Sequence, residues 1–143
     1  MLGYINYKTL TANLNTGTSG VQVSPLTSDT LSPGIWQLSY STRILGSNTG
    51  TTVTSIQSSV QVTSTSVPSG FPYTIGAQGL TCAMTTAAGY GPGNLFVSGS
   101  GTVNLIASST AIIVIYLYWS GNQLFLAGAS TNSETYLMCT RIG

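Results

Sequence analysis

Side chains that could act in acid–base or nucleophilic catalysis are scarce in this sequence. It contains no histidine, which removes the commonest general base and metal ligand. Its two carboxylates, Asp29 and Glu134, fall in the turn-like segments SDTLSPG and STNSET, so they do not suggest the paired acids of a glycosidase. Lys8 is the only lysine, and no Ser-x-x-Lys or Gly-x-Ser-x-Gly arrangement sets a base beside a serine. We therefore expect no enzymatic activity.

The two cysteines, Cys82 and Cys139, do not indicate a metal site or thiol catalysis. They lack a C-x-x-C spacing and a histidine partner. Because the N-terminus does not have the pattern of a secretion signal, buried free thiols are favoured over a disulfide, although one bridge stays open. The Gly-rich segments 89–93 and 99–101 precede neither a lysine nor a helix, so they are interpreted as turns. No metal and no cofactor are expected.

Charge is nearly absent from this chain. Five of the 143 residues are charged, and the formal net charge is +1. Nucleic-acid binding and anionic membrane binding both need clusters of Lys and Arg, so neither partner is expected. The longest apolar run, 111–119, is too short for a membrane helix, which needs about 20 residues. A surface near neutrality also lacks the repulsion that keeps copies apart, which suits a protein packed among copies or partners.

The sequence pattern is that of β-strands throughout. In segment 35–44, which follows the turn at 32–34, the large apolar residues share one parity: Trp36, Leu38, Tyr40 and Ile44. Segment 51–62 repeats the alternation with Ile56, Val60 and Val62. Since only a short Gly- and Asn-containing stretch separates the two segments, we expect them to pair as a hairpin.

Further strands are expected at 80–85, 94–98, 101–107, 111–120, 122–128 and 134–142, with a short strand within 70–80. Gly121 and Asn122 predict a tight hairpin between two of them. The apolar final strand is expected to lie centrally in a sheet. No segment has helical length and period, so the fold class is all-β, a two-sheet antiparallel jelly-roll sandwich. The chain is predicted to be one domain, 1–143, in which 1–19 is an N-terminal arm or a first strand.

Segment 111–120, AIIVIYLYWS, is apolar on both faces and therefore raises the question of what covers its second face. One parity can fill the core, while four exposed residues of the other would forfeit on the order of 6–12 kcal/mol. A loop of the same chain such as 70–80, a different protein, or copies of this chain could cover that face. We expect copies, in a homotrimer. The predicted oligomer interface is Ile113, Ile115, Leu117, Trp119, Tyr136 and Met138.

Three segments resemble the globular heads of the tumour-necrosis-factor and complement-C1q superfamily. TLSPGIWQLSYSTRI is similar to the second core strand of such heads, and SGSGTVNLIASSTAIIVIYLYWS to a following pair of strands. TYLMCTRIG is similar to the C-terminal strand that lies at the threefold axis. The resemblance covers most of residues 20–143 and implies a ten-stranded jelly roll that trimerises through one flat apolar sheet face. No calcium-binding carboxylate cluster, collagen-like stalk or receptor-type cysteine pattern accompanies it.

In its low charge and closing Thr-Arg-Ile-Gly, the chain is nearer in character to jelly-roll proteins of large DNA viruses and phages. This resemblance implies a virion component, a capsid, fibre or spike head, whose partners are its own copies and other virion proteins. The alternative is a lectin or adhesin head that binds host glycans. Sugars stack on aromatic rings, and the candidate glycan-binding residues are the tyrosines in or near loops: Tyr4, Tyr7, Tyr73 and Tyr90.

Overall fold

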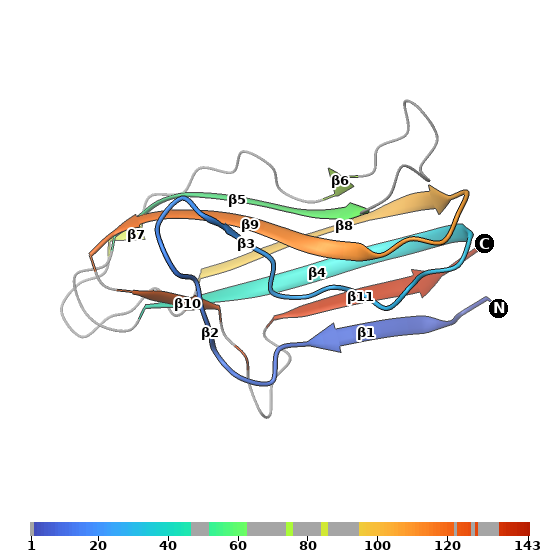
Figure 1. Cartoon of the computed structure of the whole chain (residues 1–143), viewed down its shortest axis with the longest axis horizontal. Helices are drawn as coiled ribbons and strands as arrows, with labels where there is room; N and C mark the ends of the chain where they lie inside the picture. Colours follow the sequence, from blue (N-terminus) through green and yellow to red (C-terminus); the bar gives the residue numbers. More distant parts are fainter. Residues whose placement is uncertain are drawn as a thin grey trace.

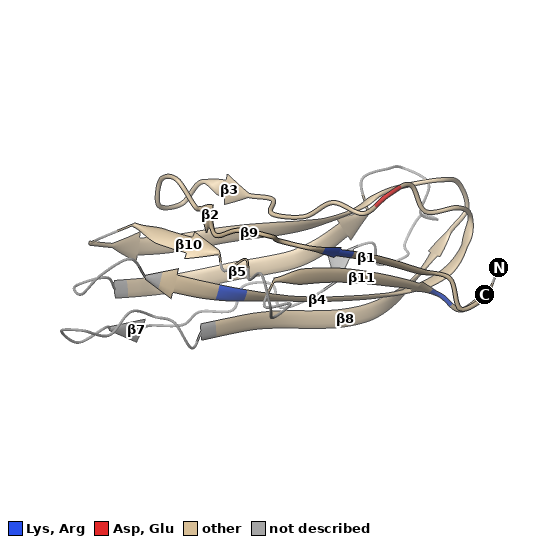
Figure 2. Ribbon diagram, turned by 90° about the horizontal axis from the view of Figure 1, so that it is seen from below, with Lys and Arg blue, Asp and Glu red and all other residues tan. Residues whose placement is uncertain are grey.

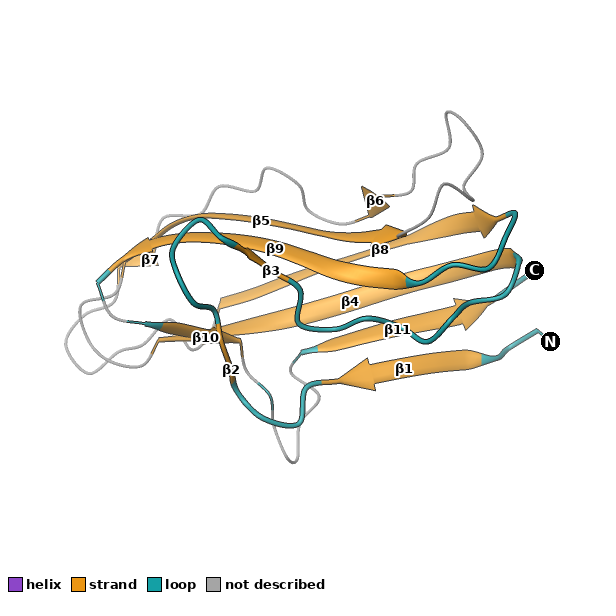
Figure 3. Ribbon diagram, in the orientation of Figure 1, coloured by secondary structure: helices purple, strands orange, loops and turns teal. Residues whose placement is uncertain are grey.

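The computed structural model describes residues 2–46, 52–62, 74–75, 84–85, 95–121, 123–126, 128 and 135–143. Over these ranges the regular elements are β-strands, and every strand pairing is antiparallel (Figures 1 and 3). No helix in the described part of the chain is long and apolar enough to span a membrane.

The first sheet, sheet A, is built around the longest strand. β4 (Gly34–Gly46) pairs along one edge with β8 (Leu95–Leu105). Its other edge pairs first with β11 (Tyr136–Arg141) and then, further along, with β10 (Leu124–Leu126). β1 (Ile5–Thr9) flanks β11, and β2 (Leu14–Asn15) flanks β10. The final strand therefore lies between two others, as its apolar composition predicts.

The second sheet, sheet B, faces the first. Its order is β3 (Gln22–Val23), β9 (Ala111–Ser120) and β5 (Thr52–Val62). Two short strands, β6 (Thr74–Ile75) and β7 (Met84–Thr85), both pair with the remaining edge of β5. Strands that follow one another repeatedly change sheet: β3 to β4, β4 to β5, β8 to β9 and β9 to β10. This is a jelly-roll sandwich, which confirms the predicted fold class.

The core lies between the two sheets and follows strict alternation along each long strand. On β4 the core-facing residues Trp36, Leu38, Tyr40 and Ile44 are at most 1% exposed. From sheet B, Ile56 and Val60 of β5 and alternate residues of β9 pack into the same cluster. The two sheets are also joined by a buried hydrogen bond of 2.7 Å between the Tyr40 and Ser58 hydroxyls, because a buried phenol needs a polar partner.

Three local predictions are wrong, two of them because the strands belong to different sheets. Segments 35–44 and 51–62 form β4 and β5 in different sheets rather than a hairpin, and 111–120 and 122–128 likewise contribute to different sheets. Gly99 and Gly101, interpreted as a turn, lie inside the single strand β8, opposite Tyr40 and Leu38. Strand pairing is decided by which apolar faces enclose a common core, and a short polar connection is equally able to cross between sheets.

The connection from β3 to β4 is tied to its surroundings by polar contacts. The Asp29 carboxylate accepts hydrogen bonds from Lys8 Nζ and Asn6 Nδ2, both at 2.7 Å. Further along, Leu31 exchanges backbone hydrogen bonds with Ser109. The hydrogen bond from Lys8, followed by that from Asn6, holds the pKa of Asp29 below its ordinary value. The connection is thus fixed to β1 on one side and to the β8–β9 turn on the other.

Replacing Ile115 with Ala is expected to lower the free energy of unfolding by about 2–5 kcal/mol, because it empties a fully buried site in the core. Urea denaturation measures the loss. Tyr118→Ala, on the outward parity of the same strand, is the matched control and should cost clearly less. A negligible cost for Ile115→Ala would contradict its placement in the core.

The contribution of Asp29 to the free energy of unfolding should be larger at neutral pH than in acid. Because its folded-state pKa is depressed, the contribution is present above the unfolded value of 3.8 and is lost as pH falls through the lower folded-state pKa. Wild type should melt slightly above Asp29→Asn at pH 7, the difference being small because the pair is exposed. The two melting curves should converge in acid. A difference that persists unchanged at pH 2 would count against the contact.

Candidate assembly face

Half of the predicted oligomer interface lies in the core of the single chain. Ile113, Ile115 and Leu117 are 0% exposed and belong to the hydrophobic cluster between the sheets. Trp119, on the same parity, is partly buried and packs against that cluster. The assignment of these residues to a partner subunit is therefore wrong. Both parities of this strand are apolar, so alternation alone does not reveal which one faces the opposite sheet.

The outward parity of β9 is covered in part by the chain itself. Val114 and its cross-strand neighbour Ser59 are 5% and 3% exposed, although both point away from the core. The Tyr116 hydroxyl donates a hydrogen bond of 2.9 Å to Gln22 of β3. Among the described apolar residues of this parity on β9, Tyr118 is the exposed one, at 39%. The same chain thus buries part of the apolar outward face of β9. Segment 70–80, the suggested cover, lies largely outside the described residues.

The other two predicted interface residues, Tyr136 and Met138, lie on the outward face of sheet A. Both are partly exposed, and their parity is opposite to that of the buried Leu137 and Cys139. Across the sheet, Met138 is in register with Tyr7 of β1 on one side and with Ser39 of β4 on the other. We call this surface the outer face of sheet A. It comprises Ile5, Tyr7, Thr9, Tyr136, Met138, Thr140, Ile35, Gln37, Ser39, Ser41, Arg43, Phe96, Ser98, Ser100, Thr102 and Asn104.

Exposed apolar side chains concentrate on this face. Among the described strands, the large apolar residues with substantial exposure on the outer face of sheet A are Ile5, Tyr7, Ile35 and Phe96. The outward side of sheet B has Tyr118. Tyr7 also stacks on Tyr136, with ring centroids 6.0 Å apart and an interplanar angle of 26°. Among the described residues the two sides of the sandwich therefore differ, and sheet A has more exposed large apolar side chains.

The same face carries very little charge. Arg43 is its one charged side chain in the described part of the chain, and its guanidinium lies 5.8 Å from the centre of the Phe96 ring. The rest is Ser, Thr, Gln and Asn between the apolar groups. Figure 2 shows how few cationic and anionic side chains the described part of the sandwich carries. A flat, neutral surface with short side chains allows close approach of a similar surface without burying unpaired charge.

Sequence reasoning missed most of this face. The other parity of segment 35–44 is polar, with Gln37, Ser39, Ser41 and Arg43, and in an isolated strand this pattern predicts a side turned to water. The signal that was available is their size: three of the four are short or uncharged, and they lie beside the aromatic and aliphatic residues of β1 and β11. That neighbourhood depends on pairing between the two ends of the chain, which alternation within one segment does not encode.

The four tyrosines proposed as glycan-binding do not form one site. Tyr4 and Tyr7 are 51% and 44% exposed on β1 or just before it. Tyr7 belongs to the outer face, whereas Tyr4 lies edge-on to the core residue Trp36, with ring centroids 6.2 Å apart. Tyr73 and Tyr90 lie outside the described residues. The two tyrosines that can be located thus point to opposite sides of sheet A.

Groups with catalytic potential are not brought together in the described part of the chain. No three His, Cys, Asp or Glu side chains cluster there as metal ligands would. Cys139 is a free thiol in the core, and burial raises its pKa to about 12, so it stays protonated at neutral pH. Cys82 and Glu134 lie outside the described residues. Asp29 is engaged with Lys8 and Asn6.

Comparison with known proteins gives structural likenesses only. No protein-family model and no curated protein sequence matches the chain. Among solved structures it is similar to the infectious bursal disease virus VP2 subviral particle, at 10% identity and TM-score 0.43, over 98% of this chain and 38% of that one.

The Gt strain of the same virus gives 8% identity and TM-score 0.43, over 99% of this chain and 38% of that one. A carbohydrate-binding module of Cellvibrio mixtus lichenase 5A, in complex with cellotriose, gives 15% identity and TM-score 0.33 over the full length of both chains. The chain thus spans 38% of the length of the two viral chains it matches. At these identities and TM-scores the likenesses assign no function to this chain.

Proposed function

We propose that this protein is a non-enzymatic structural component of a viral particle, and that it assembles as a homotrimer through the outer face of sheet A. The observation that carries the proposal is the concentration of exposed apolar side chains on one nearly uncharged sheet face. Soluble monomers seldom leave such a surface in water.

The occupant that fits this face is a second copy of the chain. Burying an Ile or an aromatic side chain stabilises by about 1.5–3 kcal/mol, and this face offers several that are still exposed. A neutral partner is required, because a charged one would bury groups for which the face supplies no counter-ion other than Arg43. Copies of this chain meet that condition, since only five of its 143 residues are charged. Closed rotational symmetry then limits growth to a discrete oligomer.

A threefold arrangement and a place in a virion rest on the resemblances described for the sequence. In the tumour-necrosis-factor and C1q heads the C-terminal strand lies at the threefold axis, and here β11 carries Tyr136 and Met138 on the proposed contact face. The low charge and closing Thr-Arg-Ile-Gly are shared in character with jelly-roll proteins of virions. Other virion proteins would then contact the surfaces that the trimer leaves free.

The native mass in solution tests the assembly. We expect sedimentation or light scattering at micromolar concentration to give three times 14.8 kDa, about 44 kDa. The variants Tyr7→Glu and Met138→Glu each place an unpaired charge in the contact, so each should reduce the mass toward 14.8 kDa while the circular dichroism spectrum stays unchanged.

Tyr118→Glu is the matched control, because it introduces the same charge at a similarly exposed tyrosine on the opposite sheet. It should leave the mass at that of wild type. A wild-type mass near 14.8 kDa would refute the proposed assembly, and loss of the trimer in Tyr118→Glu with retention in Tyr7→Glu would place the contact on sheet B instead.

A further inference from the structure

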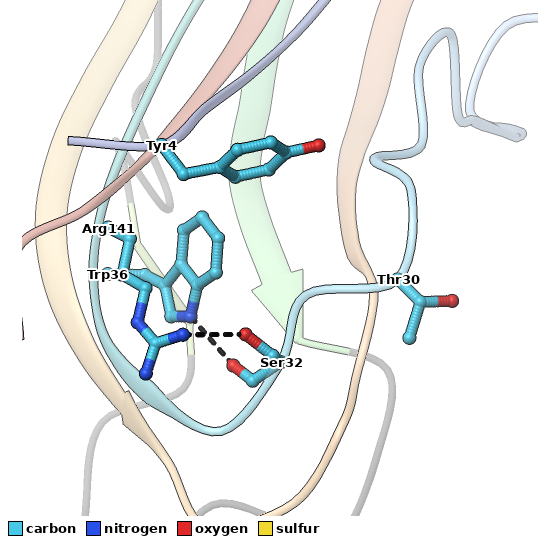
Figure 4. A pocket seen from close by; sticks show the side chains of 5 residues that line it. All are labelled: Tyr4, Thr30, Ser32, Trp36 and Arg141. Atoms are coloured by element: carbon cyan, nitrogen blue, oxygen red, sulfur yellow. Dashed lines mark hydrogen bonds between the residues drawn. The ribbon is translucent and has the colours of Figure 1, made fainter. Parts of the chain in front are cut away.

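A concave site lies at the end of the sandwich where the two chain termini meet (Figure 1). It is a cavity of about 300 Å³, at the small end of the usual range for ligand sites. Figure 4 shows the side chains that line it, which come from four separate segments: Tyr4, Thr30, Ser32, Trp36 and Arg141. This cavity is distinct from the outer face of sheet A, because Tyr4 and Trp36 are on the core side of that sheet.

One wall of the cavity is aromatic. Trp36 is 1% exposed, and its indole nitrogen donates a hydrogen bond of 2.9 Å to the main-chain oxygen of Ser32, which fixes the orientation of the ring. Tyr4 meets Trp36 nearly at right angles, at 88°. Because Tyr4 is 51% exposed, much of its ring remains available to a ligand. A fixed indole therefore supports a tyrosine ring that is still largely open to solvent.

The rest of the lining is polar, and Arg141 beside Trp36 is also held in place (Figure 4). The Arg141 guanidinium donates from Nη1 to the Ser32 hydroxyl at 3.0 Å and from Nε to the main-chain oxygen of Gly143 at 3.1 Å. Arg141 has five N–H donors, and those not used in these two hydrogen bonds are not engaged by any described residue. Gly34 has φ of +143°, and a side chain there would lie 2.9 Å from Arg141 Nη2, so glycine is needed for the guanidinium to sit where it does.

The rim of the cavity is held by contacts within the chain. Thr30 and Ser32 belong to the β3–β4 connection, which Asp29 anchors to β1 and Leu31 anchors to Ser109. A site whose walls are fixed before binding loses less conformational entropy when a ligand enters. Apart from the Arg141 cation, its polar groups are hydroxyls, and no carboxylate is among the five lining residues.

We propose that this cavity, which we call the end pocket, binds a sugar ring of a glycan. A pyranose has an apolar face that stacks on an aromatic ring and an edge of hydroxyls that exchange hydrogen bonds. Tyr4 supplies the ring, Arg141 supplies donors, and the Ser32 and Thr30 hydroxyls supply both donors and acceptors. A purely apolar ligand would leave the guanidinium unsatisfied, and a multiply charged anion would find a single cation.

The experiment is a titration of the ¹⁵N-labelled full chain, followed by TROSY NMR. The probes are methyl β-D-galactopyranoside, methyl α-D-glucopyranoside, methyl α-D-mannopyranoside and N-acetylneuraminic acid, each at millimolar concentrations because one sugar ring binds weakly. The chain has two tryptophans, so the Trp36 indole N–H reports on the pocket and that of Trp119 serves as an internal reference. Sodium acetate is titrated separately as a simple anion.

At least one sugar should shift the Trp36 indole signal in a saturable way and leave the Trp119 signal in place. Tyr4→Ala should raise that sugar's dissociation constant about tenfold through loss of the stacking surface. Tyr118→Ala is the matched control, since it removes a tyrosine of comparable exposure from sheet B, outside both the end pocket and the outer face of sheet A. It should bind as wild type does. Circular dichroism and the melting temperature confirm that both variants fold.

Three results would overturn the proposal. The first is the absence of a Trp36 shift with every sugar. The second is an equal effect of Tyr4→Ala and Tyr118→Ala, or shifts confined to the outer face of sheet A. The third is a shift produced by acetate as readily as by the sugars, which would make the pocket a site for small anions only. None of these results bears on the native mass, so the assembly proposal stands or falls separately.

Discussion

The enclosure of one apolar face of each sheet against the other is the constraint on which the rest of this structure depends. Side chains alternate along a strand, so burying Trp36, Leu38 and Tyr40 on β4 forces the intervening residues to the outside. The same holds on β11, where the burial of Leu137 and Cys139 turns Tyr136 and Met138 outward. A shift of one residue in either strand would exchange the core and the outer face completely. The composition of the outer face is therefore a consequence of how the core is packed.

Scarcity of charge shapes what this sandwich can do with its outer surfaces. In most soluble proteins Lys, Glu, Asp and Arg keep strand edges and sheet faces from associating. Here Lys8 and Asp29 satisfy one another and hold a connection in place, while Arg43 lies over Phe96. Solubility then depends on Ser, Thr, Asn and Gln, whose neutral surfaces tolerate contact with similar surfaces. The proposed self-association through sheet A uses such a surface, and Arg141 lies in the end pocket, outside the proposed contact.

The sequence predicted what is local and repeated. Alternation identified the buried residues of β4 correctly, and Ile56, Val60 and Val62 of β5 are buried as expected. The absence of helix and the two-sheet architecture also followed from composition and spacing. For β9, the expectation that copies of the chain cover its second face stays untested, although Val114 on that face is buried within the single chain. The assignment of Ile113, Ile115 and Leu117 to a partner is wrong, since two apolar parities look alike until the opposite sheet is in place.

What could not be predicted depends on residues far apart in the chain. The end pocket exists because Gly3 and Tyr4 hydrogen-bond to Arg141 through the backbone, which brings the first and last strands together. The sequence around Gly3, Tyr4 and Arg141 gives no local signal that the first and last strands pair. The mistaken hairpins have the same origin, because the sheet to which a strand belongs is set by tertiary packing rather than by the turn before it.

The most direct test of the proposed assembly face compares two tyrosines in one sample by hydroxyl-radical footprinting at micromolar concentration. Tyr7 on sheet A and Tyr118 on sheet B are 44% and 39% exposed in the single chain, so an isolated molecule would be labelled at both to a similar extent. We expect Tyr118 to be labelled readily and Tyr7 to be strongly protected, with the protection lost on dilution into dissociating conditions. Equal labelling of the two residues in the native protein would contradict the account.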